Sequence, residues 1–282
     1  MRFHLPTAEV FVPDGLPVEQ ALQRTTHMAV AAHQDDIEIM AARPILDCFQ
    51  QKDLWFAGVV VTDGRGSPRD DLYKDYTDEE MRLVRFKEQK KAAVVGEYAA
   101  QILLDIPSKV VKDASQPEPV LDIAALLRAA SPRFVYTHNL ADKHDTHVAV
   151  ALRTIAAIRS LPRSERPEKL YGCEVWRDLD WLVDDDKVGF DLTRHESLQS
   201  ALLGVFDSQI CGGKRYDLAS MGRRRANATY FASHGVDTAL GLSFGMDLTP
   251  LVADDSIDPA AYIQGFIQRF AADVKDRFGR VG

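Results

Sequence analysis

The chain has 282 residues, of which 46% are hydrophobic and 27% charged, and its formal net charge is −8 at pH 7. This composition is typical of a soluble globular protein, and the negative charge argues against general affinity for nucleic acid or anionic membranes. The sequence has no apolar run of signal-peptide or transmembrane length, so we expect a cytoplasmic protein.

Strand and helix patterns alternate from the start of the chain. Residues 1–26 read as an N-terminal extension with one short helix, VEQALQR. The apolar segments HMAVAAH (27–33) and LWFAGVVVT (54–62) predict buried strands, with a helix, PILDCFQQK, between them. The next segment, DGRGSPRDDLYKDY (63–76), is longer than most connections, as functional lids often are.

The alternation continues to about residue 160. DEEMRLVRFKEQKKAAVVGEY predicts a helix that ends near Gly96, QILLDI a strand, and EPVLDIAALLRAA a helix. PRFVYTH (132–138) predicts a strand, and HDTHVAVALRTIAAIRS a loop that continues as a helix. Such βαβ units predict an α/β fold with a mostly parallel sheet, helices on both faces, and ligands bound at the carboxyl ends of the strands.

The pattern weakens after residue 160. YGCEVW predicts a strand, residues 194–206 and 216–233 predict helices, and PAAYIQGFIQRFAADVKDRF predicts a C-terminal amphipathic helix. The chain shows no internal repeat and no linker rich in Gly, Pro or Ser. We therefore expect a single α/β domain over residues 1–282, with about 160–282 as a C-terminal embellishment.

Two clusters of ionisable residues follow predicted strands. In His33-Gln34-Asp35-Asp36 the aspartates could simply cap a helix, but capping leaves His33 unexplained. In THNLADKHDTHVAV (137–150), His144 and His147 are three positions apart at a helix start and can share one face. His138 ends its strand and is as consistent with a structural role as with a functional one.

The two clusters together contain the donors of a catalytic metal site. Zinc at such a site takes three protein ligands and keeps a position for water, and His33, Asp36 and His147 offer two imidazoles and one carboxylate. The same donor set could hold Fe(II). Asp35 and His144 then remain as neighbours that could act as base and acid.

The motifs resemble those of one family. AAHQDD resembles the AHPDD signature of the PIG-L/LmbE family of zinc-dependent N-deacetylases, and THNLADKHDTHVAV resembles its second signature. VVVTDGRGS is similar to the family's second strand and turn, and RFKEQKKAAVVG to its R-x-x-E helix. A later segment, ALLGVFDSQ (201–209), faintly resembles a family SQ segment.

The resemblance implies a Rossmann-like fold with zinc at the carboxyl ends of the strands. It makes His33, Asp36 and His147 the zinc ligands, Asp35 the general base, and His144 the group that stabilises the oxyanion or protonates the amine. The sequence departs from the family pattern at Gln34, Ile37 and the HDTH core, which indicates a branch with its own substrate.

Four further residues are candidates for substrate contact. Arg65 and Arg69 lie in the 63–76 loop, where they could contact a polar or anionic substrate or form a solvated charged surface. Asp105 ends a predicted strand and could bond a sugar hydroxyl or cap a turn. Asp142 precedes His144 by two residues and could orient the site or form a turn.

Two functions follow from these observations. The first is a zinc hydrolase that removes an N-acetyl group from an N-acetylglucosamine-type substrate or glycoconjugate. The alternative is a non-catalytic carbohydrate-binding or regulatory protein that retains the deacetylase fold. The sequence predicts no nucleic-acid partner and no integral membrane segment, and it is compatible with a homo-oligomer.

Overall fold

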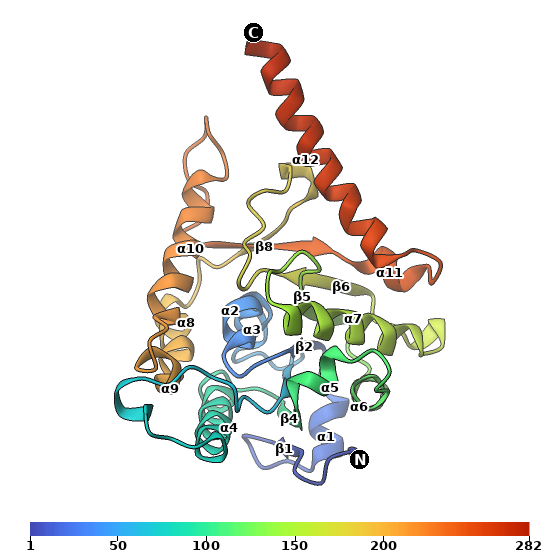
Figure 1. Cartoon of the computed structure of the whole chain (residues 1–282), viewed down its shortest axis with the longest axis vertical. Helices are drawn as coiled ribbons and strands as arrows, with labels where there is room; N and C mark the ends of the chain where they lie inside the picture. The colour runs from blue at the N-terminus through green and yellow to red at the C-terminus, as the bar shows by residue number, and fades with distance from the viewer. Residues whose placement is uncertain (282) are drawn as a thin grey trace.

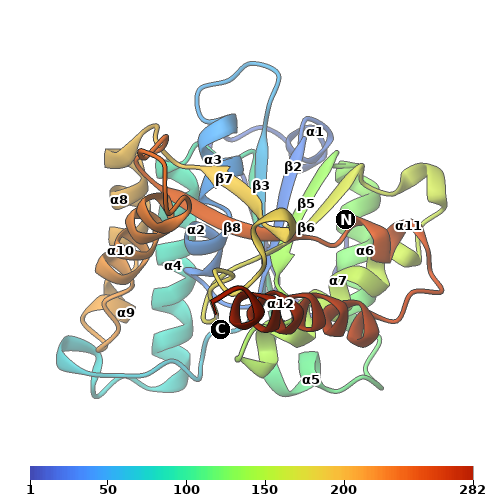
Figure 2. The ribbon, with the colours of Figure 1, turned by 90° about the horizontal axis from the view of Figure 1, so that it is seen from above.

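The computed structural model describes residues 1–281, which build an eight-stranded sheet between two layers of helices (Figures 1 and 2). The sheet order is β1-β4-β3-β2-β5-β6-β8-β7. The strands are β1 (Glu9–Phe11), β2 (His27–Ala31), β3 (Phe56–Thr62), β4 (Ala100–Ile106), β5 (Phe134–His138), β6 (Lys169–Cys173), β7 (Val188–Asp191) and β8 (Leu242–Asp247).

The centre of the sheet is parallel and its edges are antiparallel. Neighbouring strands from β4 to β6 pair in parallel, whereas β1 pairs antiparallel with β4, and β8 pairs antiparallel with β6 and β7. Strands β2, β3 and β4 are buried along their whole length, as expected for parallel strands covered on both faces. The expected mostly parallel α/β fold is confirmed, and both the first 26 residues and the residues after 160 contribute strands to this sheet.

Helices cover both faces of the sheet (Figure 2). One core cluster lies under α1 (Val18–Gln23), α5 (Ser108–Lys112), α6 (Glu118–Ala130), α7 (Asp145–Arg159), α11 (Thr249–Ala253) and α12 (Pro259–Val281). The other lies under α2 (Asp36–Met40), α3 (Ala42–Cys48), α4 (Asp78–Val95) and α8 (Glu196–Gly204), with α9 (Asp207–Ile210) and α10 (Tyr216–Tyr230) nearby. Short 3-10 helices span Asp71–Tyr73, Arg163–Glu165 and Asp184–Asp186.

Local sequence signals explain where the best-predicted helices begin and end. Thr77 caps α4 by accepting a hydrogen bond from the N–H of Glu80, whose side chain in turn accepts from the N–H of Thr77. This reciprocal pair satisfies two amides at the helix start, and the helix ends at Gly96 as predicted. None of the helices in the described chain is long and apolar enough to span a membrane.

Candidate metal centre and active site

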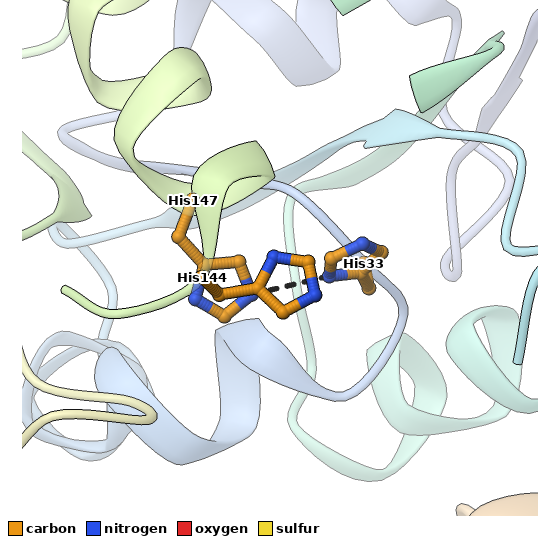
Figure 3. Close-up of side chains that lie close together, drawn as sticks. All are labelled: His33, His144 and His147. Carbon is orange, nitrogen blue, oxygen red and sulfur yellow. Dashed lines mark hydrogen bonds between the residues drawn. The ribbon is translucent and has the colours of Figure 1, made fainter. Parts of the chain in front are cut away.

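Three predicted metal ligands converge on one point. Nδ1 of His33 lies 3.2 Å from both Oδ2 of Asp36 and Nε2 of His147, and these last two atoms are 3.3 Å apart. Figure 3 shows the rings of His33, His144 and His147 directed toward one another from two separate segments. The structure therefore brings together three side chains that the sequence places 114 positions apart at most.

The sheet topology causes this convergence. His33 and Asp36 follow β2, and His147 lies in the first turn of α7, which follows β5. Because β2 and β5 are parallel neighbours, their carboxyl ends reach the same edge of the sheet. The N–H of His33 donates to Oδ2 of Asp36 at 2.7 Å, which holds the turn after β2 closed.

The donor set fits a divalent cation. Ligand atoms about 2.0–2.1 Å from a tetrahedral zinc ion stand about 3.3 Å from one another, which agrees with the 3.2–3.3 Å found here. Nδ1 of His147 lies 3.5 Å from the carboxylate of Asp142, an arrangement that leaves Nε2 free to face His33 and Asp36. His33, Asp36 and His147 thus provide the nitrogen and oxygen donors that zinc takes.

The electrostatics of the cluster favour a positive charge. Burial opposes protonation of His147, but Asp36 and Asp142 outweigh it and raise its pKa to about 10. Burial likewise opposes ionisation of Asp36, yet His147 and His33 hold its pKa well below the usual range. Two carboxylates facing one buried imidazole stabilise a cation there, either a proton or a metal ion.

His138 also lies within reach of this cluster but has its lone pair engaged. Its Nε2 lies 3.6 Å from Oδ2 of Asp36, and together with His147 these residues form a buried group that could hold a metal. However, the backbone N–H of Ala32 donates to that same Nε2 at 2.8 Å. A nitrogen that accepts this bond has no second lone pair for a metal, so the geometry favours a structural role for His138.

Asp35 lies beside the ligands with its carboxylate toward the cavity. The residue is only 5% exposed and adopts φ 100°, a conformation that is unfavourable for a residue with a side chain. Burial raises the pKa of Asp35 well above that of an exposed aspartate, although the guanidinium of Arg85, 3.2 Å away, opposes this rise. A buried carboxylate with raised proton affinity is suited to act as a general base.

A buried network behind Asp35 holds its backbone. The N–H of Asp35 donates to Oε1 of Gln89 at 3.3 Å, and Nε2 of Gln89 donates to Glu38 at 2.9 Å. The hydroxyl of Tyr98 donates to the same oxygen of Glu38 at 2.7 Å, and burial raises the pKa of Glu38 to about 8. The strained turn at Asp35 is thus supported by side chains from α4, α2 and the loop that precedes β4.

His144 also lines the cavity. Its ring centre lies 4.5 Å from that of His147 and 5.0 Å from that of His33, and its buried Nδ1 has no hydrogen-bond partner in the described chain. Burial, together with the rings of His147 and His33, lowers the pKa of His144. His144 therefore presents a neutral imidazole with an uncommitted nitrogen next to the ligands.

The four candidate substrate contacts do not line this cavity, and three of them are engaged in ion pairs. Arg65 contacts Asp63 and Glu79, and Arg69 contacts Asp78. Both oxygens of Asp105 accept from Arg82 at 2.7 Å. Asp142 is buried next to His147. Their roles toward a substrate stay predictions.

The main cavity has a volume of about 460 Å³ and is lined by His33, Asp35, Asp36 and His144, with the fully buried His147 in contact with His33 and Asp36. Its wall also includes residues that the sequence motifs did not indicate: Ser108, Lys112, Trp176, Lys214 and Tyr216. Most of these come from segments that lie outside both motif clusters. The SQ segment was the one indication there, and Gln209 indeed lines the cavity, while Ser208 donates from its N–H and hydroxyl to Glu88 of the R-x-x-E motif.

Comparisons with known proteins bear on the family and the fold of the chain. Residues 28–158 match the family model described as PIG-L, GlcNAc-PI de-N-acetylase, which confirms the resemblance predicted from the two motifs. No curated protein matches the chain significantly in sequence.

Solved structures share the fold at low sequence identity. The conserved protein TT1542 from Thermus thermophilus is 20% identical, with 82% of this chain and 98% of that chain covered and a TM-score of 0.61. GalB, the 4-carboxy-2-hydroxymuconate hydratase from Pseudomonas putida, is 15% identical, with 79% and 95% covered and a TM-score of 0.59. The N,N'-diacetylchitobiose deacetylase from Pyrococcus horikoshii is 16% identical, with 78% and 83% covered and a TM-score of 0.57. Because these structures include both a hydratase and a deacetylase, the fold by itself does not select the reaction.

Proposed function

Because residues 28–158 carry a PIG-L family domain, we propose that the protein is a zinc-dependent hydrolase that removes the N-acetyl group from an N-acetylglucosamine-type amino sugar derivative. The observation that carries the proposal is the convergence of His33, Asp36 and His147 on one point, at the wall of a cavity that Asp35 and His144 also line. A small-molecule amino sugar or glycoconjugate is the expected substrate.

In this mechanism three residues hold the metal and two perform proton chemistry. A divalent ion held by His33, Asp36 and His147 would supply Lewis acidity that activates water and polarises the amide carbonyl. Asp35 takes a proton from the attacking water as the new O–C bond forms, and His144 donates a hydrogen bond to the developing oxyanion. The C–N bond then breaks as the proton held by Asp35 passes to the amine nitrogen, which releases acetate and the free amino sugar.

The environment of Asp35 supports its assigned role. Its carboxylate must be ionised to accept a proton and must then release that proton to the amine. Burial increases its affinity for a proton, while Arg85 stabilises the ionised form. Arg85 is itself held in place because it also donates to the carbonyl oxygen of Gln34 and to Ser67.

The substitution Asp35→Asn tests the proposal. Asn has the same shape, tolerates positive φ and can still accept a hydrogen bond from Arg85, but it cannot take a proton. We expect the variant to bind one equivalent of metal, measured by mass spectrometry, and to lose turnover of acetylated amino sugars by about 100-fold or more. Full activity in this variant would contradict the assignment of the base.

Metal removal provides an independent test. Turnover in the wild-type protein should disappear with a chelator and return when zinc is added, while Fe(II) is tested in parallel because it accepts the same donors. If no acetylated amino sugar is turned over by metal-loaded protein, the hydrolase proposal fails and a non-catalytic binding role replaces it.

A further inference from the structure

The wall of the cavity carries two lysines that take no part in the chemistry described above. Lys112 comes from α5 and Lys214 from the turn that precedes α10. Among aspartate, glutamate, lysine and arginine, the other side chains that line the cavity are Asp35, Asp36 and Arg85. Asp36 is one of the proposed metal ligands and Arg85 pairs with Asp35, so the two lysines determine the charge on the rest of the wall.

These lysines have no acidic partners within the described part of the chain. Neither Lys112 nor Lys214 takes part in any of the ion pairs of residues 1–281, although the molecule carries 42 acidic side chains against 34 basic ones. Arg65, Arg69 and Arg82, which lie on the neighbouring loop and helix, are all paired. In a chain with net charge −8, unpaired lysines that line one cavity from two separate elements leave positive charge available to a ligand.

Trp176 positions one of these lysines and places an aromatic surface beside it. Nζ of Lys214 lies 5.0 Å from the centre of the Trp176 ring, and Nζ of Lys143 lies 5.8 Å from it. The ring also lies near-parallel to that of His144 at 6.4 Å. The cavity wall therefore continues from the catalytic groups through Trp176 to Lys214.

The backbone at both residues is held. The N–H of Trp176 donates to Oδ2 of Asp142 at 3.2 Å, and Asp142 also contacts His147. The N–H of Lys214 donates to the carbonyl oxygen of Gln209 at 2.9 Å. Trp176 and Lys214 thus have a defined position relative to the metal ligands.

We propose that Lys112, Lys214 and Trp176 select a substrate in which the acetylated amino sugar carries an anionic substituent, a phosphate or a carboxylate. This inference rests on the proposed function, because the acetamide group is placed at His33, Asp36 and His147. The sugar ring lies against Trp176, and the anionic group lies between the two ammonium groups. Lysines are flexible point charges that bind phosphate and carboxylate alike, and the cavity volume is within the roughly 300–1,000 Å³ of small-molecule sites.

The test compares the binding of three amino sugars that carry no acetyl group, so that binding is measured without turnover. Glucosamine, glucosamine 6-phosphate and muramic acid are titrated into the purified full chain by calorimetry, so that the neutral sugar, the phosphate and the carboxylate are compared directly. We expect at least one of the two anionic sugars to bind about tenfold more tightly than glucosamine, and this advantage to shrink at high salt. Which anionic sugar gains more identifies the substituent.

Variants connect this preference to the lysines. In the double variant Lys112→Gln, Lys214→Gln the advantage of the anionic sugar should fall to about twofold or less, while Lys91→Gln, an exposed lysine on α4 outside the cavity, should retain it. Trp176→Ala should weaken the binding of all three sugars. Equal binding of neutral and anionic sugars by the wild type, or a preference that survives in the double variant, would overturn the inference.

A turnover measurement separates this inference from the proposed function. If N-acetylglucosamine, its 6-phosphate and N-acetylmuramic acid are all deacetylated equally well, the hydrolase proposal stands and the anion-binding inference fails. If the anionic sugar binds through the two lysines but nothing is turned over, the anion-binding wall is supported and the hydrolase proposal fails.

Discussion

The carboxylate of Asp142 contacts three groups that the proposed chemistry requires. Nδ1 of His147 lies 3.5 Å from Oδ2, and the N–H groups of His144 and Trp176 donate to the carboxylate at 3.0 and 3.2 Å. Burial opposes ionisation of Asp142, but His147 and the N–H of His144 hold its pKa below the usual range. Its charge therefore helps to orient His147, the proposed metal ligand, together with the backbone of His144 and of Trp176.

From these contacts we predict that Asp142→Asn weakens metal binding. Loss of the negative charge makes His147 a poorer ligand and loosens its orientation, and such substitutions reduce metal affinity by about 10- to 100-fold. Zinc affinity is measured by competition with a chromophoric chelator. Asp145→Asn is the matched control, because Asp145 is an exposed acid three positions away, and it should bind zinc within about twofold of the wild type. Equal affinities for the two variants would show that Asp142 has no role in the metal site.

At the scale of elements, the turn after β3 depends on one glycine. Gly64 adopts φ +70°, and a Cβ there would lie 2.4 Å from Oε1 of Gln34 and 3.1 Å from Cδ of Arg85. Gln34 directly precedes Asp35, the proposed base, and Arg85 forms an ion pair with Asp35. The β3 turn and the β2 turn are therefore packed so closely that a side chain at Gly64 would displace the support of Asp35.

We predict that Gly64→Ala lowers both stability and turnover. The positive φ and the close contacts should cost about 1–3 kcal/mol of unfolding free energy, measured by chemical denaturation. Gly66→Ala is the control, since no atom lies within 4 Å of a Cβ at that position and its φ is not positive. The argument would be wrong if the two alanine variants unfolded at the same denaturant concentration.

The elements that sequence patterns predicted well are those with strong local signals. The predicted helix at 118–130 and the predicted strand at 132–138 correspond to α6 and β5, and the acids and Gly96 placed the ends of α4. The strands β1, β7 and β8 were missed, because they join the sheet by antiparallel pairing with distant residues and carry no strong local pattern. The same reason applies to Trp176 and Lys214, which reach the cavity through the tertiary fold and carry no motif.

At the scale of the whole molecule, the site depends on the parallel centre of the sheet. The C-terminal helix lies apart from the site. The motif clusters are far apart in sequence, yet the order β3-β2-β5 makes them neighbours, which is why their convergence could be predicted once a parallel sheet was expected. In contrast, α12 packs through its first half and then projects from the body (Figure 1). Its buried residues are Ile263 and Phe266, whereas Phe278 is 73% exposed.

This arrangement predicts that the end of α12 can be removed without loss of the site. A chain that ends at Ala271 keeps both buried residues of the helix and should retain zinc binding and turnover within about twofold. Its unfolding free energy should change by less than about 1 kcal/mol, because the removed side chains are almost all exposed. Phe266→Ala in the full-length chain is the contrasting variant, and loss of that buried ring should cost about 3 kcal/mol in the same denaturation experiment. If the truncation destabilised the protein as much as Phe266→Ala, or abolished metal binding, the projecting half of α12 would have to be part of the folded core that supports the site.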